Sequence, residues 1–276
     1  MKPSLTAAHL LVAALAVLPA FAADNTLTPA EKQEGWRLLF DGSTTRNWQD
    51  PARKNQPGDA WTIENGCLKT VLKPRIEEDL ISEESFGDFE FAFSWRLSPG
   101  ANTGVKYRIQ DTLFVDKTVT PRTSGFEQQL GREMETRASN RAKMARDAEG
   151  FVYVVGFEMQ LLDDERHPDA KRDPRHVTGA LYSMIAPQKK AARPAGEWND
   201  GKIVVRGQRF EHWINGVKVL EGTLDADAVR AGVMKRWGPA PGIRDALANP
   251  KPRGPISLQH HGDEVWFKNL KVRELR

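Results

Sequence analysis

Short β-type runs separated by tight-turn dipeptides are the feature that most constrains the fold of this chain. Asn65-Gly66 and Asn215-Gly216 each stand between two runs in which apolar and polar residues alternate. Asn-Gly supplies the two positive-φ residues that a two-residue β-hairpin needs. Such hairpins connect neighbouring antiparallel strands, and the turn signals recur too closely for alternating strands and helices. The pattern predicts an all-β sandwich.

The same alternation locates the other main strands. They are predicted at residues 89–97, 105–110, 152–162, 202–207, 256–260 and 264–272. Because successive side chains in a strand point to opposite faces, Phe89, Phe91, Phe93 and Trp95 share one face. A face this apolar is expected to lie in the core of the sandwich.

One segment departs from the β pattern. Residues 122–150 are predicted to form a helical insertion, because Phe126, Leu130 and Met134 recur at helical spacing. Ser124, followed by Glu127 three residues later, resembles a capping box at its start. The rest of this helix is densely charged, which favours a solvent-exposed element.

A second irregular segment covers residues 230–255. Its five prolines predict a loop excursion, with one short helix near residues 243–248.

The first 22 residues have the pattern of a signal peptide. Lys2 supplies a positive start, residues 10–18 an apolar run, and Ala20-Phe21-Ala22 a small-x-small cleavage site. We therefore expect a periplasmic or secreted protein in which residues 23–276 form a single domain. We expect no membrane insertion, because no other run in the sequence is long and apolar enough to span a bilayer.

Charge and cysteine content exclude several classes of protein. Removal of residues 1–22 leaves 39 basic and 37 acidic residues, a formal charge of +2 instead of +3. This near-neutral balance argues against nucleic acid as a partner. Cys67 is the only cysteine, so no internal disulfide can form.

Titratable and amide side chains are predicted to share faces on two strands. Strand alternation places Glu158 and Gln160 together, with their side chains directed away from the core, and likewise Gln259 and His261. A carboxylate in the middle of a strand, facing away from the core, usually has a partner or a substrate. We therefore predict that Glu158 and His261 are the catalytic acid and base, with their individual roles left open.

Other residues are candidates for substrate or metal binding. We expect Gln160, Arg108, Gln259, Trp198 and Tyr182 to contact a substrate. Asp163 follows the Glu158 strand directly, and carboxylate oxygens are the ligands that hard cations prefer. Asp163 and Glu158 could therefore hold a divalent cation.

An ordered set of motifs extends from about residue 35 to residue 275. The motifs are Leu39-Phe40-Asp41-Gly42, Asn102-Thr103-Gly104-Val105, Phe157-Glu158-Met159-Gln160-Leu161-Leu162-Asp163, Thr178-Gly179-Ala180-Leu181-Tyr182, Gly196-Glu197-Trp198-Asn199 and Leu258-Gln259-His260-His261-Gly262. Together they resemble the 3-keto-disaccharide hydrolase domain family.

This resemblance implies a concanavalin A-like jelly-roll β-sandwich, usually exported, with activity on 3-keto-glycosides. It also implies that Glu158, Gln160 and Asp163 belong to a site on the concave sheet, with His261 beside them. The substrate would be a glycoside or oligosaccharide.

Two other functions remain open at the level of sequence. A non-catalytic carbohydrate-binding module is the main alternative, because the sandwich fold hosts binding proteins and enzymes alike. A retaining glycosidase is less favoured: it needs two carboxylates about 5 Å apart, and the Glu158 strand offers an amide at Gln160 where we would expect the second acid.

Overall fold

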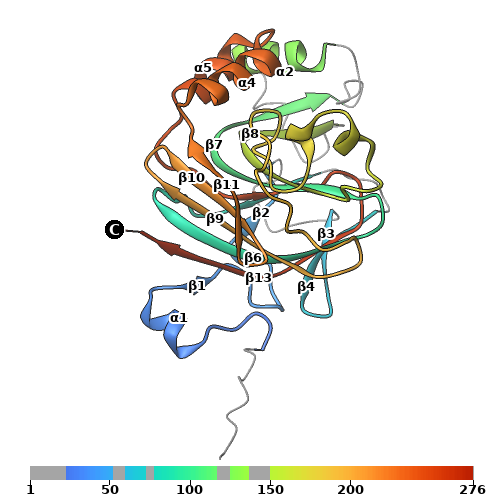
Figure 1. The fold of residues 1–276 in the computed structure, drawn as a ribbon, viewed down its shortest axis with the longest axis vertical. Helices are drawn as coiled ribbons and strands as arrows, with labels where there is room; N and C mark the ends of the chain where they lie inside the picture. Colours follow the sequence, from blue (N-terminus) through green and yellow to red (C-terminus); the bar gives the residue numbers. More distant parts are fainter. Residues whose placement is uncertain (1–22, 52–59, 73–77, 117–124, 137–149, 276) are drawn as a thin grey trace, which may run out of the picture.

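The computed structural model describes residues 23–51, 60–72, 78–116, 125–136 and 150–275. Within these ranges the chain forms two antiparallel β-sheets that pack against each other (Figure 1). This is the concanavalin A-like sandwich that the sequence predicts. The predicted signal peptide, residues 1–22, lies outside the described residues.

The larger sheet has eight strands. They are β1 (Arg37–Leu38), β3 (Trp61–Glu64), β4 (Cys67–Thr70), β6 (Phe89–Leu97), β9 (Asn199–Arg206), β10 (Arg209–Ile214), β11 (Val217–Thr223) and β13 (Val265–Glu274). Their order is β11-β10-β9-β6-β13-β4-β3, and β1 pairs with β13. We call this sheet A.

The smaller sheet, sheet B, has five strands. They are β2 (Trp48–Gln49), β5 (Leu80–Ser82), β7 (Asn102–Asp116), β8 (Gly150–Leu162) and β12 (Ser257–Leu258). Their order is β2-β5-β12-β7-β8. The two longest strands, β7 and β8, pair over most of their length and carry most of the candidate site residues.

Both predicted Asn-Gly hairpins are confirmed. Asn65 and Gly66 have φ values of 50° and 73°, and Asn215 and Gly216 have values of 49° and 79°. These left-handed conformations let Glu64 pair directly with Cys67 across the first turn.

The core lies between the sheets. The predicted aromatic face of β6 is buried there, with Phe91 and Phe93 stacked at 5.4 Å between ring centroids. Phe157, Met159 and Leu161 of β8 belong to the same cluster. Since alternate residues of β8 face the core, the residues between them face away from it.

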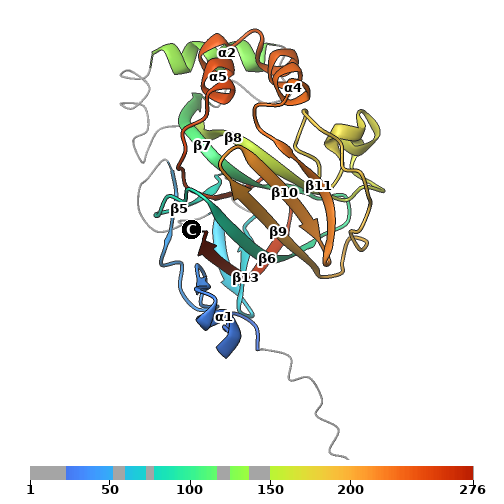
Figure 2. The same cartoon turned by 60° about the vertical axis from the view of Figure 1, so that its left-hand side comes forward.

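The helices lie mainly at one end of the sandwich. They are α1 (Pro29–Gln33), α2 (Phe126–Glu135), α4 (Asp227–Trp237), α5 (Pro241–Ala248) and the 3₁₀ turns η1 (Pro168–Lys171) and η2 (Pro174–His176). Figure 2 shows α2, α4 and α5 gathered beyond the end of the β7–β8 pair, whereas α1 lies at the opposite end.

The predicted helical insertion is confirmed in its first part. Phe126, Leu130 and Met134 are buried in α2, as their spacing indicates. The helix begins after Gly125 with no side-chain cap, so the predicted Ser124 cap is not used. Residues 137–149 lie outside the described residues, and Gly150 begins β8.

The segment from residue 230 contains more helix than predicted. α5 confirms the short helix expected near residues 243–248, but α4 extends into the predicted loop. The inward face of α4 includes Gly232, where an added Cβ would lie 2.7 Å from Met184 Cα. Val229, Val233 and Trp237 of the same face recur at helical spacing, but the dense prolines that begin at Pro239 led to the prediction of a loop.

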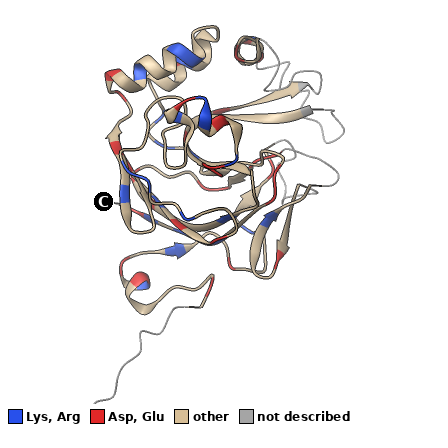
Figure 3. Cartoon of the chain, turned by 45° about the vertical axis from the view of Figure 1, so that its right-hand side comes forward, with Lys and Arg blue, Asp and Glu red and all other residues tan. Residues whose placement is uncertain are grey.

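Charge is distributed without a dominant sign. Figure 3 shows acidic and basic residues interspersed over both strands and helices in this view. Among the described residues, no helix combines the length and the apolar character needed to cross a bilayer.

Candidate active site

A row of polar side chains crosses three strands on the outer face of sheet B. Ser257 of β12 pairs with Lys106 of β7, which pairs with Glu158 of β8. The relative exposures of Lys106 and Glu158 are only 3% and 7%. Two oppositely charged groups are therefore held side by side away from bulk water, on rigid strands.

Lys106 has a fixed ionic partner. Its Nζ lies 2.8 Å from Oδ2 of Asp79, which precedes β5. Asp79 also accepts a hydrogen bond from the backbone N–H of His260 at 3.0 Å. Burial opposes protonation of Lys106, but Asp79 and Glu158 outweigh it and raise its pKa. Lys106 is therefore a permanent cation beside Glu158.

The carboxyl group of Glu158 is shielded from water. Burial raises its pKa, while the cations Lys106 and Arg236 and the ring of His261 partly oppose the rise. A carboxyl group whose pKa is raised binds its proton more tightly than an exposed one, and carboxyl groups tuned in this direction serve as general acids and bases.

Gln160 lies beside Glu158 on the same face, as predicted. Its Nε2 lies 3.1 Å from Oδ1 of Asn102. In the alternative amide orientation the nitrogen donates to Glu158 Oε1 at 3.2 Å and to the Thr103 carbonyl at 3.3 Å. The hydrogen-bond partners favour the second orientation, because the amide nitrogen of Gln160 then donates to the carboxylate of Glu158.

Arg236, which the sequence analysis does not single out, reaches the site from α4. Its Nη2 donates to the hydroxyl oxygen of Tyr153 at 3.2 Å, and its guanidinium lies 4.7 Å from the centre of the Tyr182 ring. It was missed because residues 230–255 are predicted as a loop.

Tyr182 is placed next to Glu158 by the backbone. Its N–H donates to the Glu158 carbonyl at 3.0 Å, and its hydroxyl donates to Asp169 Oδ2 at 3.1 Å. Burial raises the pKa of Tyr182, so the phenol stays protonated. Tyr182 is therefore a neutral hydrogen-bonding group within the site.

His261 approaches the same face from the loop between β12 and β13. The predicted strand at residues 256–260 is shorter in the structure, because β12 ends at Leu258. His261 therefore lies in the loop that follows β12, and β7 separates β12 from the Glu158 strand β8. His261 is still close enough to influence the pKa of Glu158.

Gln259 is anchored by its backbone. Its N–H donates to the Gly104 carbonyl at 2.9 Å. Its side-chain Oε1 is buried and has no hydrogen-bond partner among the described residues. A buried acceptor without a partner is unusual and is expected to bind a donor from water or a ligand.

Two histidines and an aspartate meet beside this row. The rings of His167 and His261 are 6.2 Å apart, and His261 Nδ1 lies 3.9 Å from Asp263 Oδ2. Burial lowers the pKa of His167, and the neighbouring His261 lowers it further. Burial opposes ionisation of Asp263, but the His261 ring and the Asn102 N–H lower its pKa. These shifts favour a neutral His167 and an ionised Asp263.

Two predicted substrate-binding residues lie elsewhere. Nη2 of Arg108 donates to the Gly207 carbonyl at 2.8 Å, in the β9–β10 turn of sheet A, and Arg108 is only 3% exposed. Trp198 packs under Lys268, whose Nζ lies 4.4 Å from the ring centre. The guanidinium of Arg96, on the outer face of sheet A, also packs over the Trp198 ring. Both residues are therefore separated from Glu158 in the structure. The prediction failed because strand alternation does not determine which sheet or loop a side chain will contact.

The predicted metal pair of Glu158 and Asp163 is also separated. Strand alternation does not place Asp163 on the face of Glu158, because the two residues are an odd number of positions apart. The Asp163 carboxylate is directed toward nearby backbone N–H groups. It accepts backbone hydrogen bonds from Gly100 at 2.8 Å, Glu165 at 3.1 Å and Arg166 at 3.2 Å. Asp163 therefore stabilises the turn after β8 and is not available beside Glu158.

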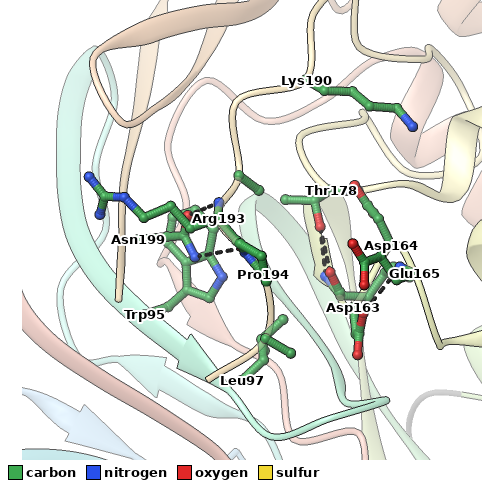
Figure 4. A pocket seen from close by; sticks show the side chains of 13 residues that line it. Trp95, Leu97, Asp163, Asp164, Glu165, Thr178, Lys190, Arg193, Pro194 and Asn199 are labelled. Carbon is green, nitrogen blue, oxygen red and sulfur yellow. Dashed lines mark hydrogen bonds between the residues drawn. The ribbon is translucent and has the colours of Figure 1, made fainter. Parts of the chain in front are cut away.

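A pocket of about 190 Å³ opens next to that turn and does not include the Glu158 row. Figure 4 shows Asp163, Asp164 and Thr178 on one side of it and Trp95 and Asn199 on the other. Its lining lies at the end of β8, where sheets A and B approach each other. The titratable side chains of the Glu158 row therefore do not line this pocket.

These residues define the class of the protein: a concanavalin A-like sandwich whose sheet B carries buried groups suited to acid–base chemistry.

Comparison with known proteins gives the family. Residues 35–273 match the model of the 3-keto-α-glucoside-1,2-lyase-like domain. A 3-keto-disaccharide hydrolase of Bacteroides thetaiotaomicron is 30% identical over an alignment of 256 residues that covers 88% of this chain and 79% of the relative. The chain therefore belongs to the 3-keto-α-glucoside-1,2-lyase-like family, as the motifs indicate.

Solved structures share the fold. A Parabacteroides distasonis protein, provisionally described as a glycosyl hydrolase, superimposes with a TM-score of 0.67 at 23% identity, covering 92% of this chain and 100% of its own. A second protein from the same organism, described in the same way, gives a TM-score of 0.55 at 21% identity, covering 87% and 99% of the two chains.

Proposed function

We propose that this protein cleaves the glycosidic bond of 3-keto-glycosides, including 3-keto-disaccharides, by elimination followed by hydration. The observation that carries the proposal is the buried Glu158 carboxyl group, which lies among Lys106, Arg236 and His261 and has a raised pKa. Family membership and the activity named for the Bacteroides relative support the same substrate class.

The reaction needs one group to remove a proton and another to supply one. A ketone at C3 makes the C2 hydrogen acidic and places the C1 oxygen β to the carbonyl. Proton removal at C2 forms an enolate, whose collapse breaks the C1–O bond and releases the alcohol after protonation. Water then adds across C1 and C2, giving the free 3-keto sugar.

Glu158 and His261 supply these proton transfers, one as base and one as acid. Positioned acid–base catalysis of this kind contributes roughly a hundred- to ten-thousand-fold. Lys106 and Arg236 add positive charge beside Glu158, where negative charge develops on the enolate. Arg108, which was expected to contact the substrate, takes no part in this role, because its guanidinium is bound to the β9–β10 turn of sheet A.

Amide and phenol groups around the pair suit a sugar. Gln160 and Tyr182 border Glu158, and the unpartnered Gln259 Oε1 offers an acceptor to a sugar hydroxyl. Binding through such groups holds the reacting bond in place.

The test is a product assay on a 3-keto-disaccharide and on its unoxidised parent. We expect the 3-keto substrate alone to be cleaved, with one solvent deuterium at C2 of the product in D₂O. Glu158→Gln should lose at least about 100-fold in kcat/KM, whereas Glu83→Gln, on an exposed turn, should retain wild-type rates. Binding of both sugars by calorimetry without turnover of either would instead identify a carbohydrate-binding module.

We also propose that residues 1–22 direct export, on the basis of their signal-peptide pattern. Fractionation of expressing cells, with N-terminal sequencing of the product, should recover a periplasmic or secreted chain that begins near Ala23. A chain retained in the cytoplasm with Met1 intact would contradict this.

A further inference from the structure

We propose that His167, His261 and Asp263 bind one divalent transition-metal cation, of the class that includes Zn²⁺, Mn²⁺ and Co²⁺. His167 follows β8, whereas His261 and Asp263 lie in the β12–β13 loop, so the group is assembled from distant parts of the chain. These residues differ from Glu158 and Asp163, the pair for which the sequence predicts a possible cation.

The geometry of the three side chains suits a single ion. One potential ligand atom from each residue lies within 4.8 Å of the other two. Metal–ligand bonds of about 2.0–2.2 Å place ligand atoms roughly 3–4.3 Å apart. The 3.9 Å between His261 Nδ1 and Asp263 Oδ2 already falls in this range. Small side-chain movements would complete the group.

The donor set also indicates which cations bind. Two imidazoles and one carboxylate suit transition metals better than Ca²⁺ or Mg²⁺, which prefer oxygen ligands alone. Three protein ligands leave coordination positions open for water or substrate, as in catalytic metal sites. The Asn102 N–H donates to Asp263 Oδ2 at 3.0 Å and orients this carboxylate.

His167 makes one contact that competes with the cation. Its Nδ1 accepts a hydrogen bond from the Asp169 N–H at 3.2 Å, which leaves the proton of the neutral ring on Nε2. Coordination through Nε2 therefore requires the ring to change tautomer and give up this long hydrogen bond. Among the described residues, this is the hydrogen bond of the His167 ring that binding would have to break.

The consequence for catalysis rests on the proposed function. Because the charge of a protonated His261 acts on Glu158 through space, a cation bound at His261 would act on the same carboxyl group. A ligating His261 has no free lone pair for proton transfer. With the cation bound, Glu158 would replace the Glu158–His261 pair, taking the C2 proton and passing it to the departing C1 oxygen. The cation would polarise the substrate ketone and stabilise the enolate.

The test measures metal binding directly. Purified protein is stripped with a chelator, then titrated with ZnCl₂, MnCl₂ and CoCl₂ by calorimetry, and the visible absorption of bound Co²⁺ is recorded. We expect one cation per chain. His167→Ala and Asp263→Asn should each weaken binding by at least about 100-fold, whereas His176→Ala, a histidine of the same loop region, should bind as the wild type does.

Circular dichroism checks that each variant is folded, and His167→Gln replaces His167→Ala if the alanine variant is not. The proposal is overturned if stripped wild-type protein takes up none of the three cations, or if a folded His167 or Asp263 variant binds with wild-type affinity. Either result concerns metal binding alone, so it can be told apart from a failure to cleave 3-keto-glycosides.

Discussion

The carboxyl group of Glu158 occupies the space that a side chain at Gly104 would need. A Cβ built at Gly104 would lie 2.1 Å from Glu158 Oε1 and 2.8 Å from its Cδ. Gly104 pairs with Gln160 on the adjacent strand, so the glycine opens a gap in the outer face of sheet B into which Glu158 folds. The conformation of the proposed catalytic residue therefore depends on a neighbour without a side chain.

Gly104→Ala should displace the Glu158 side chain and lower kcat/KM by at least about tenfold, because small misplacements of a reacting group reduce rates strongly. The measurement is steady-state kinetics on a 3-keto-disaccharide, with thermal unfolding to check the fold. Gly242→Ala is the matched control, since its nearest neighbour, Met134 Sδ, would lie 3.4 Å from the new Cβ. Equal rates in both variants would show that the gap has no role.

Arg236→Met should move the limb of the pH–rate profile that reports Glu158 to higher pH. The reason is that Arg236 lowers the pKa of Glu158, so removal of the guanidinium lets burial raise that pKa further. The profile of kcat/KM against pH measures the shift. Lys235→Met, a change at the exposed neighbour, should leave the profile unchanged. A drop in rate with no shift would assign Arg236 to substrate contact instead.

His212 should make the fold sensitive to mild acid. Burial between the Tyr107 hydroxyl and the Gly179 carbonyl lowers the pKa of His212 to about 4. Because the unfolded chain protonates near pH 6.5, stability present above that pH is lost as the pH falls toward 4, by about 3 kcal/mol.

Urea unfolding at several pH values measures this loss. His212→Gln should flatten the change in unfolding free energy between pH 6.5 and pH 4.5. Below pH 4.5, carboxylates with lowered pKa values, such as Asp41 at about 2, also contribute to acid unfolding. If the unfolding free energy of the variant still falls with pH as steeply as that of the wild type between pH 6.5 and pH 4.5, another group causes the loss of stability.

Asp163→Asn should destabilise the fold without affecting metal uptake. Burial favours the protonated form, but hydrogen bonds from the backbone of Gly100, Glu165 and Arg166 lower the pKa of Asp163. Loss of the charged acceptor should cost about 2 kcal/mol. The comparison is between Asp163→Asn and Asp263→Asn in unfolding free energy and in Zn²⁺ binding. Weakened Zn²⁺ binding in a folded Asp163→Asn variant would contradict the turn-stabilising role.

Local sequence patterns determined much of the sandwich. The Asn65-Gly66 and Asn215-Gly216 turns, the aromatic face of β6 and the common face of Glu158 and Gln160 were all predictable. Each depends on backbone conformations or on the two-residue period of a strand, which neighbouring residues decide.

Tertiary structure decided which groups meet. Strand alternation does not reveal that β7 separates β8 from β12, that Arg108 reaches sheet A, or that α4 brings Arg236 over Tyr182. The approach of His167 to His261 is also invisible along the chain. These contacts depend on which apolar faces pack together, and such packing is a property of the whole fold and not of any one segment.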